Sequence, residues 1–335
     1  MTAGLRTGLG IVISLLFLYL AVRNVDFKLA AGSVSGLDWN YLALCVFCQA
    51  ASLFTRAALW QNILSYEKSV SYRHAFESLI IGYMGNNILP FRMGEAMRAF
   101  AMGRKEKISR TLAFASVILE RLYDLFTLLL FFAVLVFLMT LDRRVVLSAA
   151  VVSIFLGIAV LFLYLIASDF LKVPSRVFKM FLRLVPAGRH ETAERIIGSF
   201  VRGIILVRTL RQALVLLGLS VLAWTLWTAI LYFGLKAFHL DLPLTATILM
   251  TVVVHIGVMI PSSPGFIGVF QWLCIFSLSF FGVPKEIALT FSLIVHMIQY
   301  IPTTLLGWWY LTRMHVTGYR SLKEELDRAG AAEGG

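Results

Sequence analysis

Long apolar segments, separated by short basic stretches, occupy most of this chain. A helix needs about 20 apolar residues to cross the hydrocarbon core of a bilayer. Backbone N–H and C=O groups inside a bilayer must be satisfied within the protein, which favours helices. The sequence therefore predicts an all-α polytopic membrane protein. Its full spans, about six in number, are expected at residues 5–22, 41–64, 111–139, 145–167, 212–235 and 287–311.

Composition and charge agree with this class. The chain has 335 residues, of which 59% are hydrophobic and 14% charged, whereas soluble domains are about 45–50% apolar and 25% charged. The net charge is +12, and the basic residues fall at the ends of apolar segments. That pattern is typical of positive-inside topology and of contact with anionic lipid headgroups. We therefore expect anionic or zwitterionic membrane lipids as partners, and no nucleic acid.

Two basic loops set the predicted orientation. Lysine and arginine crowd residues 98–110 and 172–211, and loops of this kind remain in the cytoplasm. The C-terminal tail, with Arg313, Arg320 and Lys323, is expected on the same side. The sequence thus predicts a multi-pass protein whose C-terminus is cytoplasmic.

Two segments broken by proline and glycine interrupt the series of spans. For the last span to enter the cytoplasm, residues 244–281 must begin and end outside. If Arg6 is cytoplasmic, residues 75–103 must begin and end inside, whereas a single tilted crossing at 75–97 would place the N-terminus outside. Re-entrant hairpins turning at residues 86–90 and 261–264 would do this, although two complete spans within 244–281 would also fit. Opposed hairpins are the arrangement of an inverted repeat, whose tips meet near the bilayer centre.

We therefore expect one integral membrane domain over residues 1–335. Its two pseudo-halves, 1–168 and 212–315, are joined by the basic segment 169–211. Apolar residues recur at helical spacing in this segment, which predicts an amphipathic helix on the membrane interface. A simple connector and a lipid-binding element are both compatible with that pattern.

Chemistry at the two breaks is predicted from helix ends. Ser263 before Pro264 is typical of an N-cap with proline at the first helical position. Pro90 can begin a second half-helix, with Arg92 on its first turn. Helix N-termini attract anions, and a guanidinium forks onto phosphate. The alternative is that Arg92 and Glu95 pair only to stabilise the loop.

A third group of polar residues lies within the predicted span 111–139. Glu120 and Asp124 share a helix face, and Arg121 can reach Asp124. Each charge near the bilayer centre costs about 2.5–3.5 kcal/mol, so these residues should face the interior. The pairs expected are Arg92 with Glu120 or Asp124, and Arg121 with Glu95. A solvated cluster on a protruding helix is the structural alternative.

An ordered set of these motifs resembles the lysylphosphatidylglycerol synthase transmembrane-region family. The members are flippase-like membrane domains, found alone or fused to aminoacyl-lipid synthases, and some stand-alone members are hopanoid-associated. The resemblance covers almost the whole chain and implies lipid translocation. Members often carry an acidic residue where this chain has Gln271, which leaves the substrate open. The motifs are Asn87-x-x-Pro90-x-Arg92-x-Gly94-Glu95-x-x-Arg98, Glu120-Arg121-x-x-Asp124, Pro261-x-x-Pro264-Gly265-x-x-Gly268 and Gly282-Val283-Pro284.

The function expected is that of a flippase-like lipid translocase in a bacterial cytoplasmic membrane. It would move a phosphate-headgroup or polyprenyl-phosphate-type lipid through a central polar cavity, with any amine or sugar directed toward the carboxylates. The alternative is a membrane-embedded enzyme or accessory subunit of lipid-linked glycosyl or hopanoid synthesis. The residues expected at the headgroup are Asn86, Asn87, Pro90, Arg92, Glu95, Arg98, Glu120, Arg121, Asp124, Ser262, Ser263, Gly265 and Gln271.

Enzymatic chemistry is not expected. The sequence has no Walker, DxD or HExxH motif, so we expect transport without ATP. No spacing supports a metal site, and His255 and His296 are predicted to pack or form hydrogen bonds. We expect no cofactor. A lipid-synthesis enzyme and a second copy of the chain remain as further partners of a protein of this kind.

Overall fold

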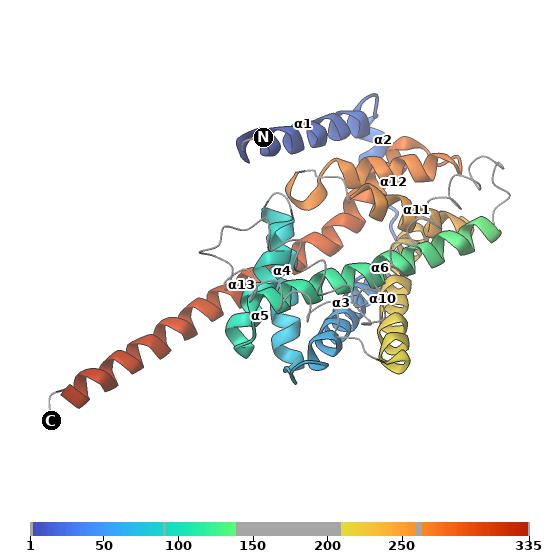
Figure 1. Ribbon diagram of the computed structural model, residues 1–335. Helices are drawn as coiled ribbons and strands as arrows, with labels where there is room; N and C mark the ends of the chain where they lie inside the picture. The colour runs from blue at the N-terminus through green and yellow to red at the C-terminus, as the bar shows by residue number, and fades with distance from the viewer. Residues whose placement is uncertain (1–2, 90–91, 139–208, 259–262, 334–335) are drawn as a thin grey trace.

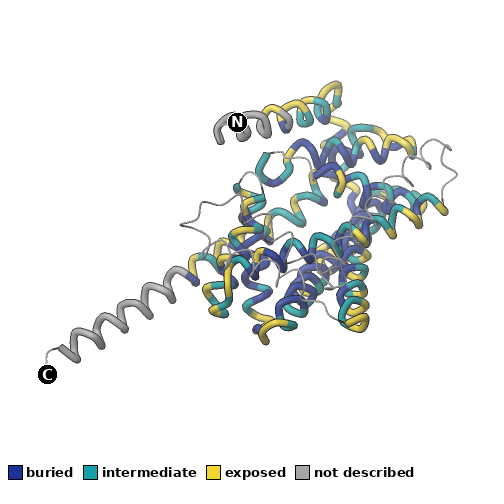
Figure 2. The backbone as a smooth tube through the Cα atoms, in the orientation of Figure 1, coloured by how far each residue is buried: buried dark blue, intermediate teal, exposed yellow. Residues whose placement is uncertain are grey.

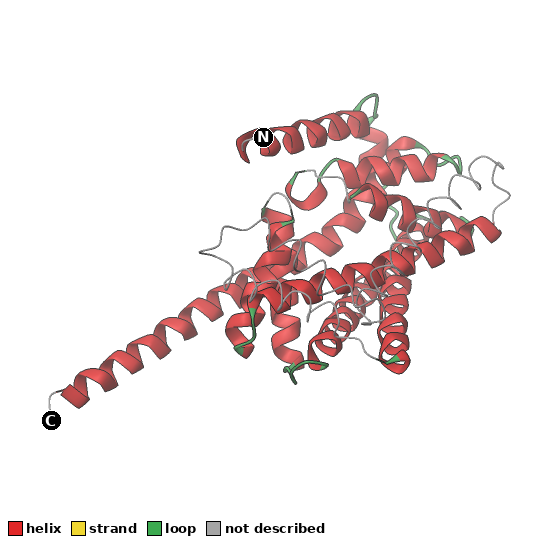
Figure 3. Ribbon diagram, in the orientation of Figure 1, coloured by secondary structure: helices red, strands yellow, loops and turns green. Residues whose placement is uncertain are grey.

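The structure, a computed structural model, describes residues 3–89, 92–138, 209–258 and 263–333. The regular elements in these ranges are helical (Figures 1 and 3). They are α1 (Ala3–Val22), α2 (Phe27–Gly32), α3 (Trp39–Ser65), α4 (Tyr72–Ile88), α5 (Met93–Glu106), α6 (Arg110–Leu138), α10 (Leu210–Ala237), α11 (Leu244–Gly257), the 3-10 turn η2 (Pro264–Phe266), α12 (Val269–Ser279) and α13 (Lys285–Glu333).

Four of these helices are long and apolar enough to cross a membrane: α3, α6, α10 and the part of α13 from Lys285 to Met314. They confirm the helices predicted at 41–64, 111–139, 212–235 and 287–311. The predicted span 145–167 lies outside the described residues, as does nearly all of the predicted amphipathic segment 169–211. The all-helical prediction therefore holds for the described part of the chain.

Large apolar side chains are exposed on the outer faces of the long helices, as expected of a surface that contacts acyl chains. Examples are Phe47 on α3, Phe137 on α6, Leu214 on α10 and Leu305 on α13. Buried positions gather toward the middle of the molecule (Figure 2). The exterior of the long helices is therefore apolar, and the polar side chains described below point inward.

The central pair of helices is α3 and α10, which run antiparallel. Cys45 Sγ donates to the Ile230 carbonyl at 3.3 Å, and Ser52 Oγ donates to the Ala223 carbonyl at 3.2 Å. The Asp38 N–H donates to the carbonyl of Ala237 at one end of the pair. The C-terminal ends of α3 and α10 therefore lie at opposite ends of the molecule.

Helices α4 and α5 follow α3 and form the first hairpin. Its two ends meet at Glu106, whose Oε1 accepts from the Ser71 N–H at 2.9 Å and whose carbonyl accepts from Lys68 Nζ at 2.6 Å. Near the tip, a Cβ atom on Gly85 would lie 2.7 Å from the Cα of Gly94. Glycine is required there because the two backbones touch.

Helices α11 and α12 follow α10 and form the second hairpin. Leu242, before α11, packs against the large apolar cluster that contains Val283, after α12. Because α3 and α10 are antiparallel, the two hairpins begin at opposite ends of the pair.

Two predicted helix starts are only partly right. Ser263 and Pro264 take the predicted N-cap and first position, but of the short turn η2. Helix α12 begins at Val269 and not at Pro264, because Gly265 (φ 66°) and Gly268 (φ 88°) take left-handed conformations that confine the first turn to η2. The Gly268 N–H is capped by Gln271 Oε1 at 2.7 Å. Helix α5 begins at Met93, so Arg92 is its N-cap and does not lie on its first turn.

Candidate functional site

A polar cavity of about 190 Å³ lies among α3, α4, α10, α11 and α13, next to the tips of both hairpins. One water needs about 10–15 Å³ of space measured in this way, so the cavity is large enough to hold several waters. Its charged lining consists of three arginines and one carboxylate. These are Arg56, Arg92, Arg121 and Glu95.

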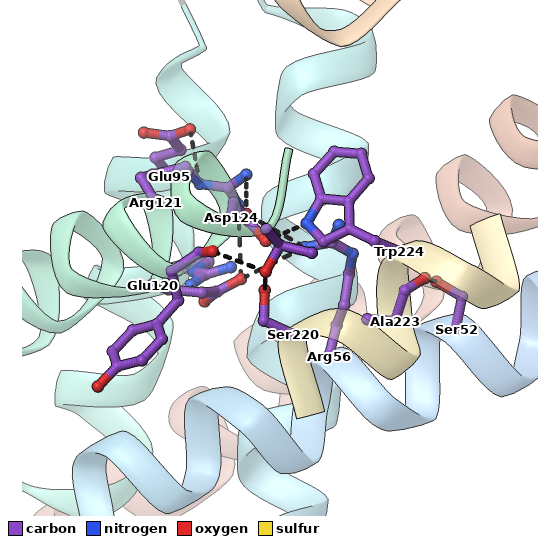
Figure 4. Close-up of polar contacts among 12 residues, drawn as sticks. Ser52, Arg56, Glu95, Glu120, Arg121, Asp124, Ser220, Ala223 and Trp224 are labelled. Carbon is purple, nitrogen blue, oxygen red and sulfur yellow. Dashed lines mark hydrogen bonds and ion pairs between the residues drawn. The ribbon is translucent and has the colours of Figure 1, made fainter. Parts of the chain in front are cut away.

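Asp124 lies behind the arginines and is saturated by donors (Figure 4). Its carboxylate accepts from Arg121 Nη1 at 2.9 Å, Arg56 Nη1 at 3.1 Å and Trp224 Nε1 at 2.8 Å. Only 3% of the residue is exposed. Charge-assisted hydrogen bonds of this kind offset the cost of burying an ion. Asp124 therefore orients Arg56 and Arg121 and is not open to a ligand.

Glu120 forms the second buried anion, and it is 0% exposed. It pairs with Arg98, whose guanidinium lies 4.3 Å from the ring centroid of Trp60. Its Oε1 also lies 3.5 Å from Arg121 Nη2 and 3.9 Å from Arg56 Nη1. The carboxylate is thus surrounded by guanidinium groups.

The predicted ion pairs are only partly present. Arg121 does approach Glu95, with 3.7 Å between Nε and Oε1. Arg92, however, forms no ion pair with Glu120 or Asp124 among the described residues, so that prediction is wrong. The partners of Glu120 and Asp124 instead come from helices packed beside α6, since Arg98 projects from α5 and Arg56 from α3.

Arg92 is the most weakly neutralised cation at the cavity. Its nearest carboxylate is Glu95, at 3.7 Å, and its Nη2 donates to the Val258 carbonyl at 3.2 Å. A third of its side chain, 33%, is exposed. Its backbone is left-handed (φ 53°), a conformation that is uncommon for a residue with a side chain and that clusters at functional sites.

The two hairpin tips meet beside Arg92. The Arg92 guanidinium lies 5.5 Å from the ring centroid of Phe266 in the second tip. Tyr300, on α13, donates from its hydroxyl to the Asn87 carbonyl at 3.1 Å. A Cβ atom on Gly265 would lie 3.3 Å from that same carbonyl. The tips therefore form one wall of the cavity.

The opposite part of the lining is aromatic and amide-rich. The ring of His255 packs edge-on against Trp224 and Trp227, at centroid distances of 4.3 and 4.1 Å. Its Nδ1 donates to the Thr251 carbonyl at 2.8 Å, which makes Nε2 the acceptor whenever the ring is neutral. Trp227 Nε1 donates to Gln299 Oε1 at 3.0 Å.

The residues predicted from the sequence fall into three groups: those that line the cavity, those that lie behind its lining, and those discussed in the next paragraph. Asn86, Asn87, Arg92, Glu95 and Arg121 line the cavity. Arg98, Glu120 and Asp124 lie behind that lining.

Those of the remaining predicted residues that the structure describes are outside the lining. Gln271 is buried behind it and donates from Nε2 to His296 Nδ1 at 2.9 Å. The Ser263 N–H donates to Ser14 Oγ on α1 at 2.7 Å, and Gly265 packs against Tyr300. Pro90 and Ser262 lie outside the described residues.

Sequence reasoning missed Arg56, Gln49 and Gln299, all of which line the cavity. The signal was present, because a polar or ionisable residue inside an apolar span marks a functional position by default. The aromatic residues Trp224 and Trp227 carried no such signal, since tryptophan is common throughout apolar segments.

No group of three or more His, Cys, Asp or Glu that could hold a metal ion occurs in the described part of the chain. His255 and His296 form the hydrogen bonds given above. The site is therefore an assembly of guanidinium, amide and aromatic groups.

These features define a multi-pass helical membrane protein with a buried, arginine-lined polar cavity. Comparison with known families is more specific. Residues 8–307 match the family described as the lysylphosphatidylglycerol synthase TM region, and the chain belongs to this family, as its motifs predicted.

The chain is also similar to two archaeal proteins that carry the name UPF0104 membrane protein. One, from Methanocaldococcus jannaschii, is 25% identical over 315 residues, which cover 89% of this chain and 92% of that protein. Another, from Methanothermobacter thermautotrophicus, is 26% identical over 282 residues, covering 80% of this chain and 81% of that protein. The similarity thus extends across most of each protein.

Proposed function

We propose that this protein is a lipid translocase. The phosphate-bearing headgroup of a membrane lipid would pass through the cavity between the two hairpin tips while its tails remain in the bilayer. The observation that carries the proposal is the charge balance of the site. Among the residues that the structure describes, Arg56, Arg92, Arg98 and Arg121 pair with Glu95, Glu120 and Asp124, which leaves one cation for an anionic ligand.

The depth of these charges supports the proposal. Glu120 and Asp124 follow the start of α6 at Arg110 by 10 and 14 residues, or about 15–21 Å at 1.5 Å per residue. Half of the hydrocarbon core is about 15 Å thick. If α6 crosses the membrane from Arg110, the site lies near the bilayer centre.

In this proposal both hairpins are re-entrant, one from each face of the membrane, and they form an inverted repeat whose tips meet at the cavity. Their opposed origins on the antiparallel pair α3 and α10 support that arrangement. The protein would act in a cytoplasmic membrane with its C-terminus inside the cell. An ion gradient, the membrane potential or the gradient of the lipid itself would drive the movement.

The alternative, a membrane-embedded enzyme, has less support. A carboxylate serves as base or nucleophile only when it can reach the reacting group. Glu120 and Asp124 are enclosed by guanidinium groups, and Glu95 approaches both Arg92 and Arg121. A translocase needs these carboxylates only to position the arginines.

The test is lipid movement in liposomes that contain the purified protein, with a fluorophore on an acyl chain and a quencher outside. Arg92→Gln should abolish most of the movement, whereas Arg92→Lys should retain part of it. Arg73→Gln is the matched control, because Arg73 lies on the same hairpin but 76% of its side chain is exposed. Equal rates for Arg92→Gln and Arg73→Gln would refute the proposed site.

A further inference from the structure

The lining of the cavity changes from charged to neutral along two helices. On α3, Gln49 lies on the same helix face as Arg56, seven residues earlier in the chain and about 10 Å away. On α10, Trp224 contacts Asp124 and Arg56, whereas Trp227, one turn further, contacts Gln299. A ligand in this cavity would therefore meet arginines at one end and amides and aromatic rings at the other.

No lining carboxylate is available for an ammonium group. Glu95 is the only carboxylate among the described lining residues, and it already lies 3.7 Å from both Arg92 and Arg121. Glu120 and Asp124 are enclosed behind the lining. A headgroup amine would therefore meet uncompensated guanidinium charge and be repelled by it. This argues against the expectation that an amine is directed toward the carboxylates.

The amide end has unused hydrogen-bonding capacity. Trp227 Nε1 fixes Gln299 Oε1 as the acceptor, and the remaining Nε2 has no hydrogen-bond partner among the described residues. Gln299 Nε2 is a donor, and a hydroxyl oxygen can accept from it. Polar groups left without a partner are costly, so they favour a ligand that pairs with them.

We infer that the headgroup is a polyol phosphate, meaning a phosphate ester of a neutral, hydroxyl-bearing group such as glycerol, inositol or a sugar. This inference rests on the proposed function, because it assigns a substrate class to the same cavity. The phosphate binds Arg92 beside Arg56 and Arg121. The hydroxyl groups bind Gln299 and Gln49, with Trp227 covering the carbon skeleton.

The first experiment compares lipids with identical acyl chains in liposomes that contain the protein. Phosphatidylglycerol and phosphatidylinositol should cross about tenfold faster than phosphatidylethanolamine, because only the last places an ammonium beside the arginines. Phosphatidic acid, which has the phosphate without hydroxyls, should be slower than phosphatidylglycerol. An ethanolamine lipid as fast as the glycerol lipid would overturn the inference, as would phosphatidic acid at an equal rate.

The second experiment separates this inference from transport. Calorimetric titration of the detergent-solubilised protein with glycerol 3-phosphate, phosphoethanolamine and inorganic phosphate should give the tightest binding for glycerol 3-phosphate. If that order holds but no lipid crosses the liposomes, the translocase proposal fails and the ligand class stands. If lipids cross with no headgroup preference, the ligand class fails and the translocase stands.

A single substitution should reverse the preference. Gln299→Glu keeps the acceptor for Trp227 Nε1 and replaces the unpartnered Nε2 with a negatively charged oxygen. It should raise ethanolamine-lipid movement relative to glycerol-lipid movement by about tenfold. Gln212→Glu, at the start of α10 and outside the lining, should leave the ratio unchanged. An unaltered ratio in Gln299→Glu would remove Gln299 from the site. If this variant does not fold, the wild-type comparisons still decide the inference.

Discussion

The two hairpins that meet at the cavity differ sharply in their content of charged residues. The first hairpin, α4 and α5, carries charges from base to tip, including Glu77, Lys105, Glu106, Arg92 and Arg98. The second, α11 to α12, contains no Asp, Glu, Lys or Arg. Its interior is held by apolar packing instead. Two hairpins of similar shape can therefore have different roles, since the first contributes charged side chains to the cavity and the second an uncharged wall.

The opposed origins of the hairpins give the largest expected effect, which is an all-or-none difference in side. Single cysteines at Ser69 and Ser109 flank the first hairpin, and cysteines at Asp241 and Ser279 flank the second. In sealed cells, an impermeant thiol reagent should label only one of these pairs. The native Cys45, Cys48 and Cys274 are buried, so background labelling should be low. Labelling of all four positions from the same side would contradict the claim that the two hairpins begin on opposite sides of the membrane.

Removing a buried charge beside the first hairpin should cost the most stability. Glu120→Gln leaves Arg98 buried without its counter-ion, and breaking such a pair costs about 3–5 kcal/mol. Thermal unfolding in detergent would measure the loss. The double variant Arg98→Met/Glu120→Met should recover much of it, because apolar groups can replace a whole ion pair. A single variant as stable as wild type would contradict the buried ionic core.

Alanine substitutions of glycine should destabilise the two hairpins by different, smaller amounts. A Cβ on Gly85 meets the backbone of Gly94 at 2.7 Å, whereas a Cβ on Gly257 meets only side-chain atoms of Leu273. Gly85→Ala should therefore cost about 1–3 kcal/mol by overpacking, and Gly257→Ala less, because a side chain can move. Gly218→Ala on α10 is the control, since nothing lies within 4 Å of its Cβ position. A larger loss for Gly257→Ala would reverse the argument.

The smallest effect concerns pH at the base of the first hairpin. Partial burial alone would raise the pKa of Glu106, but the Ser71 N–H and His74, which donate to its carboxylate, hold that pKa below its usual value. A lowered pKa adds stability above about pH 4.3, the ordinary value for glutamate. That stability is lost as the pH falls through the lowered pKa. Hydrogen exchange of the Ser71 amide should accelerate relative to its intrinsic rate in this acid range.

Glu106→Gln should remove the acid dependence and leave the exchange of α11 unchanged. The second hairpin has no carboxylate to titrate, so its amides provide an internal control in the same sample. Identical acid dependence in both hairpins would indicate general unfolding and not a local contact at Glu106.

Periodicity and hydropathy predicted the parts of the fold that depend on local sequence. Apolar runs with few charges, such as those that form α3 and α10, have one stable conformation in a bilayer. The breaks near Asn87 and Gly265 predicted the hairpin tips for the same reason. The start of α12 was mispredicted, because the positive φ angles of Gly265 and Gly268 are not fixed by composition.

The site was harder to predict because its pairings are tertiary. Glu120 and Asp124 were identified from their cost inside an apolar helix. Their pairing with Arg98 and Arg56 was not predicted, since these arginines lie 22 and 68 positions away on helices whose packing the sequence does not specify. Gln299 is a still clearer case. Its role depends on which of its two amide atoms Trp227 occupies.

The ion pairs of the site also bear on how the protein is made. The arginine and carboxylate partners of the buried network all fall between Arg56 and Asp124, and Trp224 on α10 adds only a neutral donor. Chains enter the membrane from the N-terminus during synthesis. The first half can therefore neutralise its own charges before α10 leaves the ribosome. We expect this half to insert without waiting for the second, so that α10 arrives at an ionic site that is already assembled.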